Sequence, residues 1–274
     1  MTLIQLKQID GELTAGRLGH VHGFQLEWKS VDTVDIGPGN LVNAVNTAVI
    51  INPGTLTADL STSGVNGLDT GVRAINTWYY LYVIAGSSGT ASLWSISPGS
   101  PTLPLGYTEA FRRVGIFRND GADELRAMGR IEGISTWRYY SISDPALNDE
   151  CKLLDNGGEL GFSALSLAAC VPPTSRVARI VPHLKSRFRF GVILFLRETG
   201  SPSTIGETAI GVGAPGGGGR GFLNQAVGQG GGRQSGSPMD VNVNASQSVD
   251  YRMWRSGNQA DIYVVGYHDQ LLGV

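Results

Sequence analysis

Charged residues are scarce in this chain. Lys, Arg, Asp and Glu together make up 16% of its 274 residues, and the formal net charge is −2. Such a balance provides no general positive field that would attract a phosphate backbone. The composition therefore argues against a protein that binds nucleic acid with its whole surface.

Cysteine and long apolar runs are also nearly absent. Cys151 and Cys170 are the only cysteines, too few for a disulfide scaffold, so we expect both to be reduced and buried. The N-terminus lacks the apolar core of a secretory signal, and no window approaches the roughly 18 apolar residues of a membrane span. We expect a chain that is made and folded in the cytoplasm, with no membrane partner.

Motifs for catalysis and cofactor binding are missing or incomplete. There is no Gly-x-Ser-x-Gly elbow, and neither cysteine lies in a nucleophile signature. Residues 211–216 formally match a dinucleotide fingerprint, but Pro215 and the glycines after it forbid the helix that would receive the phosphates. We predict that the chain is not an enzyme and binds no cofactor.

One acidic cluster leaves a hydrolytic alternative open. It lies in a segment that we interpret as a solvated linker and comprises Asp144, Asp149, Glu150 and Asp155. Two of these carboxylates could act as the acid and base of a glycoside hydrolase, provided that the fold sets them at the required separation. The solvated linker is the simpler interpretation.

Two short patterns could hold a metal ion. His20 and His22 would share one face of a strand, although two ligands do not complete a zinc site. Asp120, Asp123 and Glu124 could bind calcium, yet the sequence from Asn119 to Gly121 equally suits a hairpin turn. We interpret the histidines as hydrogen-bonded residues at the edge of an apolar face, and the acidic residues as part of a hairpin turn. We therefore predict no metal site.

The sequence is rich in glycine and in segments where apolar and polar residues alternate. With 39 Gly and 12 Pro, the chain favours short strands joined by tight turns. We predict strands at the alternating segments 47–51, 75–85, 91–97, 111–118, 136–142, 187–196, 241–245 and 261–267. The fold class is all-β, with two domains of the β-sandwich or jelly-roll type.

Turn signals divide the predicted fold into four parts. Residues 1–40 form an N-terminal attachment segment, in which His22 to Trp28 alternate like a half-buried strand. The first β domain covers 41–144, a connector covers 145–175, and the second β-sandwich domain covers 176–274.

The region from Ile75 to Gly121 carries the most distinctive pattern. It has an aromatic strand with Trp78-Tyr79-Tyr80, a Pro-rich turn from Pro101 to Tyr107, and a strand that starts at Arg112-Arg113 and ends in a Gly turn. Both faces of the aromatic strand are apolar and need cover. In its order of parts, this region resembles a module of bacteriophage tail-fibre and other virion structural proteins, over roughly residues 67–130.

The resemblance implies a structural component of a tailed bacteriophage virion, as a fibre, tail or capsid-associated protein. It also implies a homotrimer that contacts other virion proteins, and a location in the virion. From a different functional class, the alternative is a receptor-binding module that recognises a host surface glycan.

A Gly-rich segment, 211–236, interrupts the second predicted domain. A segment of this composition loses much entropy on ordering, so a long exposed loop is one interpretation. Long loops in compact domains are often functional, and we therefore name a candidate contact tip within it. Its residues are Arg220, Phe222, Leu223, Asn224 and Gln225.

Overall fold

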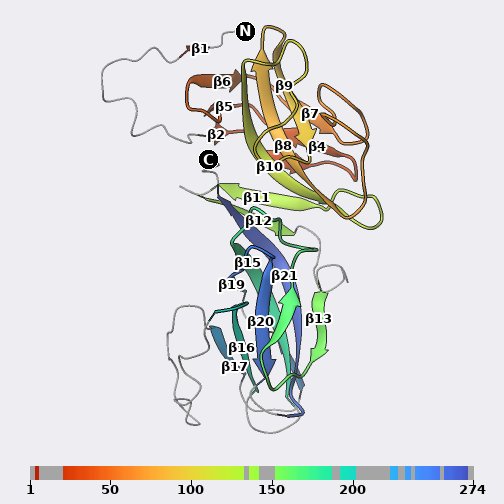
Figure 1. Ribbon diagram of the computed structural model, residues 1–274, viewed down its shortest axis with the longest axis vertical. Helices are drawn as coiled ribbons and strands as arrows, with labels where there is room; N and C mark the ends of the chain where they lie inside the picture. The colour runs from red at the N-terminus through yellow and green to blue at the C-terminus, as the bar shows by residue number, and fades with distance from the viewer. Residues whose placement is uncertain are drawn as a thin grey trace, which may run out of the picture. The chain divides into compact units, whose positions relative to one another are not determined.

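The computed structural model confirms the all-β fold class. It describes residues 4–5, 21–132, 136–141, 152–186, 192–201, 223–227, 232–235, 238–253 and 256–270. Within these ranges the chain forms antiparallel sheets and contains no helix (Figure 1). It divides into two compact units: unit 1 covers 1–137 with 270–274, and unit 2 covers 138–269.

Three antiparallel sheets build unit 1. The first has the order β1 (Ile4–Gln5), β6 (Ala48–Asn52), β5 (Gly39–Val42) and β2 (Val21–Gly23). The second has the order β3 (Leu26–Trp28), β4 (Thr33–Ile36) and β7 (Leu56–Asp59). The third has the order β10 (Ala110–Asn119), β8 (Thr77–Gly86) and β9 (Gly89–Ser95). Strand β11 (Met128–Glu132) follows them along the chain.

The aromatic strand β8 lies at the centre of unit 1. Every residue from Tyr79 to Ala85 is buried, on both faces of the strand. The Tyr82 hydroxyl still finds an acceptor, since it donates to the Ser97 carbonyl at 2.7 Å. Cover for both faces thus comes from the chain itself, so the apolar faces of β8 do not argue for a trimer.

The N-terminal region behaves differently from the single strand that we predicted over 22–28. Gly23 and Phe24 adopt positive φ angles of 77° and 52°, which breaks the strand between β2 and β3. As a result, β2 pairs with β5 in one sheet while β3 pairs with β4 in another. Alternation in sequence cannot reveal such a break, because it does not record the left-handed residues.

The division into units differs from our predicted boundaries at 40, 144 and 175. Strands β2 and β4, from the predicted attachment segment, pair with β5 and β7 of unit 1 respectively. The predicted connector contains two strands, β13 (Lys152–Gly157) and β14 (Ser163–Ser166). Strand β12 (Thr136–Ser141) spans the division at 137 and 138. The attachment role of the first 40 residues stays a prediction.

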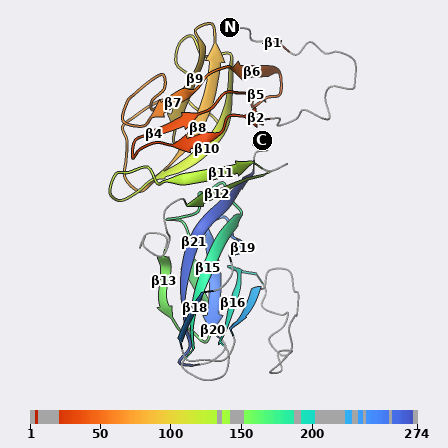
Figure 2. The ribbon, with the colours of Figure 1, turned by 180° about the vertical axis from the view of Figure 1, so that it is seen from behind.

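Unit 2 is built from two sheets. In the first, β21 (Gln259–Gln270) pairs with β13 and with β15 (Val177–Ser186), as Figure 2 shows. The far edge of β15 pairs with β18 (Gly232–Ser235) and β19 (Met239–Asn242). The second sheet has the order β14, β20 (Ser248–Met253), β16 (Val192–Glu198) and β17 (Leu223–Val227).

Alternate residues of these strands form the core of unit 2. The buried set contains Ala178, Ile180, Leu184, Leu194, Leu196, Val249, Tyr251, Met253, Ile262 and Val264. Since side chains alternate between faces, the residues between them lie on the outer faces of the two sheets. Cys170 is buried, as predicted, and Cys151 lies outside the described residues.

Candidate contact surfaces

The predicted contact tip falls partly on an edge strand of unit 2. Leu223, Asn224 and Gln225 begin β17, and their register partners on β16 are Leu196, Phe195 and Leu194 respectively. Arg220 and Phe222 lie outside the described residues, as does most of the Gly-rich segment. Within that segment the structure contains two strands, β17 and β18, which the sequence analysis did not identify. The contact role of the five residues stays a prediction.

Next to β17, the outer face of the second sheet of unit 2 carries stacked arginines and phenylalanines. The Arg197 guanidinium lies 3.8 Å from the ring centroid of Phe162. The Arg252 guanidinium lies 5.0 Å from the Phe162 centroid and 4.7 Å from the Phe195 centroid. We call these four residues the arginine–phenylalanine face. Such stacking attracts each cation to the ring electrons and keeps both groups in fixed positions.

Strand register produces this face. Phe195 is paired with Arg252, and Arg197 is paired with Asp250, whose carboxylate accepts a hydrogen bond from the Arg197 Nε at 2.8 Å. The residues between them on β16 and β20 point into the core. Sequence reasoning missed the face because the two strands lie more than 50 residues apart, and only their pairing brings the side chains together.

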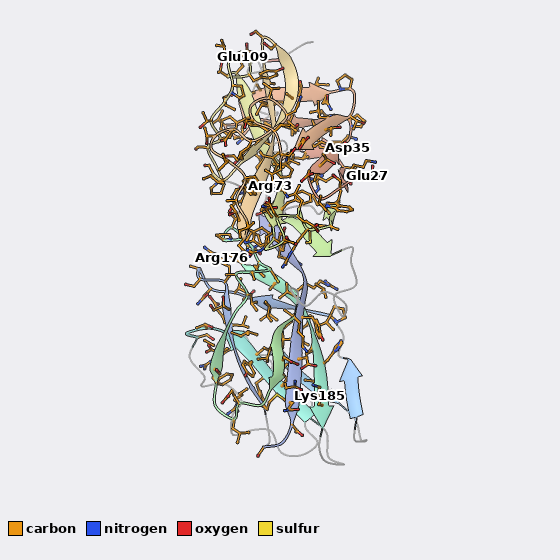
Figure 3. The ribbon with its side chains drawn as sticks, turned by 90° about the vertical axis from the view of Figure 1, so that its right-hand side faces the viewer. Glu27, Asp35, Arg73, Glu109, Arg176 and Lys185 are labelled. Carbon is orange, nitrogen blue, oxygen red and sulfur yellow. The ribbon has the colours of Figure 1, made fainter. Side chains whose placement is uncertain are left out.

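In unit 1, Arg73 ties three segments together. Its Nε lies 2.9 Å from the Asp123 Oδ1, and its Nη2 donates to the Asn119 Oδ1 at 2.9 Å. The same guanidinium forms an ion pair with Asp32 and donates to the Val31 carbonyl. The Arg73 side chain is only 13% exposed. Figure 3 shows Arg73 and Glu109 toward opposite ends of unit 1.

The residues beside Arg73 are apolar and exposed. Val72 is 86% exposed and Ile75 is 54% exposed. The backbone between them is fixed, since the Ala74 N–H donates to the Tyr79 hydroxyl at 2.8 Å and the Asn119 Nδ2 donates to the Ala74 carbonyl at 2.8 Å. We call residues 72–75 the apolar tip. Sequence reasoning missed this tip, because neither the anchors nor the exposure can be read from local pattern.

The acidic residues near Gly121 hold a turn. The Asp120 Oδ1 accepts hydrogen bonds from the backbone N–H groups of Ala122 at 2.9 Å and Glu124 at 3.1 Å. Asp123 has a positive φ of 65° and pairs with Arg73. These contacts are those of a tight turn.

The ranges that the structure describes contain no group of three or more His, Cys, Asp or Glu side chains placed to hold a metal ion. His22 lies on β2 and is exposed, and His20 is outside those ranges.

A second charged cluster stabilises the first sheet of unit 2. Asp261 is fully buried, and its carboxylate accepts from the Asn156 N–H at 2.7 Å and lies 3.3 Å from the Lys185 Nζ, labelled in Figure 3. Lys152 pairs with Asp155, and this hydrogen bond raises the pKa of Lys152 and lowers the pKa of Asp155. Of the four acids that we considered for hydrolysis, Asp155 is the one within the described residues, and it is held in this ion pair.

Within the described ranges, no helix is long and apolar enough to cross a membrane.

Comparison with known proteins identifies no family. No protein-family model matches the chain, and no curated protein matches it. Among solved structures, a chain from "Structure of infectious bursal disease virus Gt strain" is similar at 13% identity with a TM-score of 0.16, and the match covers 90% of this chain and 65% of that one. The present chain thus spans less than two thirds of that chain's length.

Proposed function

We propose that this protein is a structural component of a tailed bacteriophage virion, acting through assembly contacts as a fibre, tail or capsid-associated protein. The proposal rests first on the resemblance of residues 67–130 to a module of virion structural proteins. Two of the segments that carry the resemblance pair in one antiparallel sheet, the aromatic segment on β8 and the Arg-Arg segment on β10. These two segments therefore belong to one sheet.

The observation that best supports an assembly role is that Arg73 fixes the loop that carries the apolar tip. This arginine is largely buried, and its hydrogen bonds join three segments of unit 1. The result is a fixed backbone that presents Val72 and Ile75 to solvent. A rigid loop loses little conformational entropy when a partner binds, so preorganised apolar residues favour contact with another protein.

The charged clusters elsewhere have the same character. Asp261 anchors the β13 segment through Asn156 and Lys185. Asp250 holds Arg197 against Phe162. In each case, a carboxylate that could serve chemistry instead fixes the position of strands or loops, as expected for a protein whose work is to keep its shape.

Two parts of the proposal come from the resemblance alone. These are the homotrimer and the contacts with other virion proteins. The alternative, recognition of a host surface glycan, would use the Gly-rich segment 211–236 and the side chains next to it. The arginine–phenylalanine face lies beside β17 of that segment, and its partly exposed Phe162 and Arg252 are aromatic and cationic groups of the kind that a sugar site uses.

Location and copy number in purified particles test the proposal. Quantitative mass spectrometry should find a fixed number of copies per particle, and a cryo-electron map should hold the two β units at every symmetry-equivalent position. Absence of the chain from washed particles would overturn the structural role. Glycan binding by the isolated chain, together with a distal location, would favour the receptor-binding alternative.

A further inference from the structure

Lysine, asparagine and aspartate side chains from three neighbouring strands meet in the first sheet of unit 2. Asp261 lies on the central strand β21, with Asn156 on β13 to one side and Lys185 on β15 to the other. The Lys185 Nζ donates to the Asn156 Oδ1 and lies 3.3 Å from the Asp261 carboxylate. An amine is therefore in contact with an amide carbonyl and a carboxylate at the same time.

The Asn156 side chain is held at both ends of its amide. Its Oδ1 accepts from Lys185, while its Nδ2 donates to the Asp155 Oδ1 at 2.8 Å. The backbone is fixed as well, since the Asn156 N–H donates to the Asp261 Oδ1 at 2.7 Å. The carbonyl thus points to the lysine and the amide nitrogen points to Asp155. In this orientation an amine can add to the Asn156 Cγ while the amide nitrogen departs. Asn156 is exposed, so the departing group reaches solvent.

Asp261 is placed to move a proton. Its side chain is fully buried, and the Lys185 side chain is only 17% exposed. Burial disfavours the charged forms of both groups, so transfer of a proton from the ammonium to the carboxylate costs less here than in water. The neutral amine that results is the nucleophile. The other lysine nearby, Lys152, pairs with Asp155 and lies farther from Asp261, at 4.0 Å.

We propose that Lys185 and Asn156 join in an intramolecular isopeptide bond, with Asp261 as the group that carries the proton. The Lys185 Nζ forms a bond to the Asn156 Cγ, and the bond from Cγ to Nδ2 breaks. Two protons leave the Nζ, one of them through the Asp261 carboxylate. Both end on the departing nitrogen, which is released as ammonium, and Asp261 returns to the carboxylate. The reaction needs no other reactant.

This bond ties β13 to β15 across β21. It closes the loop of residues 156–185 and so restricts the unfolded chain, as a disulfide does. The hydrogen bonds of Asp261 already hold β13 in place, and the isopeptide bond makes that connection permanent. The reaction occurs once in each chain and modifies the chain itself, so it is not turnover of a substrate. The inference goes beyond the assembly role and does not depend on it.

Mass spectrometry of the purified full chain under denaturing conditions tests for the bond. After incubation at neutral pH, the mass of the wild type should be lower by one ammonia. Trypsin should then release residues 153–176 and 180–187 as one branched peptide, because a lysine in an amide bond is not cleaved. Lys185→Arg keeps the positive charge but lacks the nucleophilic amine, so it should keep the full mass.

Asp261→Asn separates proton transfer from proximity of the reacting groups. In this variant the linked fraction, followed from the time of synthesis, should accumulate at least about a hundredfold more slowly than in the wild type. Asp250→Asn is the matched control, because it removes another buried carboxylate of unit 2 and should link at the wild-type rate. Thermal melting checks folding. If Asp261→Asn unfolds, Asn156→Ser removes the electrophile at an exposed position and should abolish the loss of ammonia.

Asn66 provides an internal control in the same sample. Like Asn156, it is exposed, has a positive φ and precedes a glycine, but its Oδ1 accepts from Ser92. An asparagine before glycine can also lose ammonia by attack of the next backbone nitrogen, which gives a succinimide, and this route is open to both residues. A wild-type chain of full mass, a mass loss that persists in Lys185→Arg, or equal losses at Asn66 and Asn156 without a branched peptide would overturn the inference. Asp261→Asn that links as fast as the wild type would overturn the role of the carboxylate.

Discussion

The guanidinium of Arg73 and the carboxylate of Asp123 meet at 2.9 Å across 50 residues of sequence. This pair joins the loop before β8 to the turn after β10, and Asn119 completes it with a hydrogen bond from its Nδ2 to the Asp123 Oδ1 at 2.6 Å. The two long central strands of unit 1 are thus locked at the end where β8 begins.

Replacing Arg73 by Met should destabilise unit 1. The change keeps the aliphatic length but removes hydrogen bonds to Asn119, Asp123 and Val31. The expected loss is about 2 kcal/mol, because charged hydrogen bonds contribute about 1.5 to 3 each while exposure of Asp123 reduces the total. Urea unfolding measures the change. The matched control is Arg179→Met, which removes a surface pair with Asp240 and should cost under about 1 kcal/mol. Equal effects for both variants would contradict the stabilising role of the Arg73 contacts.

Truncation of Tyr80 should unfold unit 1. Its ring is buried in β8 and stacks with the Arg113 guanidinium at 5.5 Å. Tyr80→Ala should cost about 3 to 5 kcal/mol against a total stability of about 5 to 15. Circular dichroism during heating reports the loss. An unchanged melting profile would mean that β8 is not the centre of the unit.

Tyr79 should titrate late in alkali. Burial raises the pKa of its hydroxyl, and the hydrogen bond from the Ala74 N–H partly opposes this rise. The folded pKa therefore exceeds the unfolded value, so this group's contribution to stability is present below about pH 10 and is lost as the pH rises through the folded pKa. Absorbance at alkaline pH, compared between the wild type and Tyr79→Phe, isolates this phenol. A phenol that ionises with the exposed tyrosines would show that the anchor of the tip is open to water.

Asp155 should contribute to the pH dependence of stability in the acid range. The hydrogen bond from Lys152 lowers the pKa of the Asp155 carboxyl. Its stabilising contribution is therefore present above the unfolded pKa and is lost as the pH falls through the folded one. Asp155→Asn should make the stability of the chain less dependent on pH in the acid range, by a small amount because the group is exposed. Melting temperatures across the acid range provide the measurement, with Asp59→Asn as a comparison in unit 1. If the melting temperature of Asp155→Asn falls in acid as much as that of the wild type, the ion pair between Lys152 and Asp155 does not contribute to stability.

Gly23 should resist replacement. It has a φ of 77°, and a Cβ at this position would lie 2.4 Å from the Pro38 carbonyl oxygen. Gly23→Ala should therefore cost more than about 1 kcal/mol, through both the positive φ and the clash. Gly54→Ala is the matched control, because a Cβ there meets no atom within 4 Å. A Gly23→Ala variant as stable as Gly54→Ala would mean that the chain does not switch sheets at this point.

Much of the fold was open to sequence reasoning. The alternation of Trp78 to Ile84 predicted a strand buried on both faces, and β8 is such a strand. Glycine and proline marked the turns around it, because they favour backbone conformations that strands do not use. These signals are local, so a chain carries them before it folds.

The candidate surfaces could not be predicted from local sequence pattern. Arg73 and Asp123, or Phe195 and Arg252, become neighbours only when distant strands pair in a particular register. The break at Gly23 and Phe24 likewise depends on where Pro38 approaches the chain. Local pattern alone predicted an all-β chain with an aromatic strand buried on both faces, because periodicity and turn chemistry act between near neighbours in the chain. The tertiary structure alone decided which side chains meet and which stay exposed, because register, sheet order and loop closure depend on contacts between residues far apart in the chain.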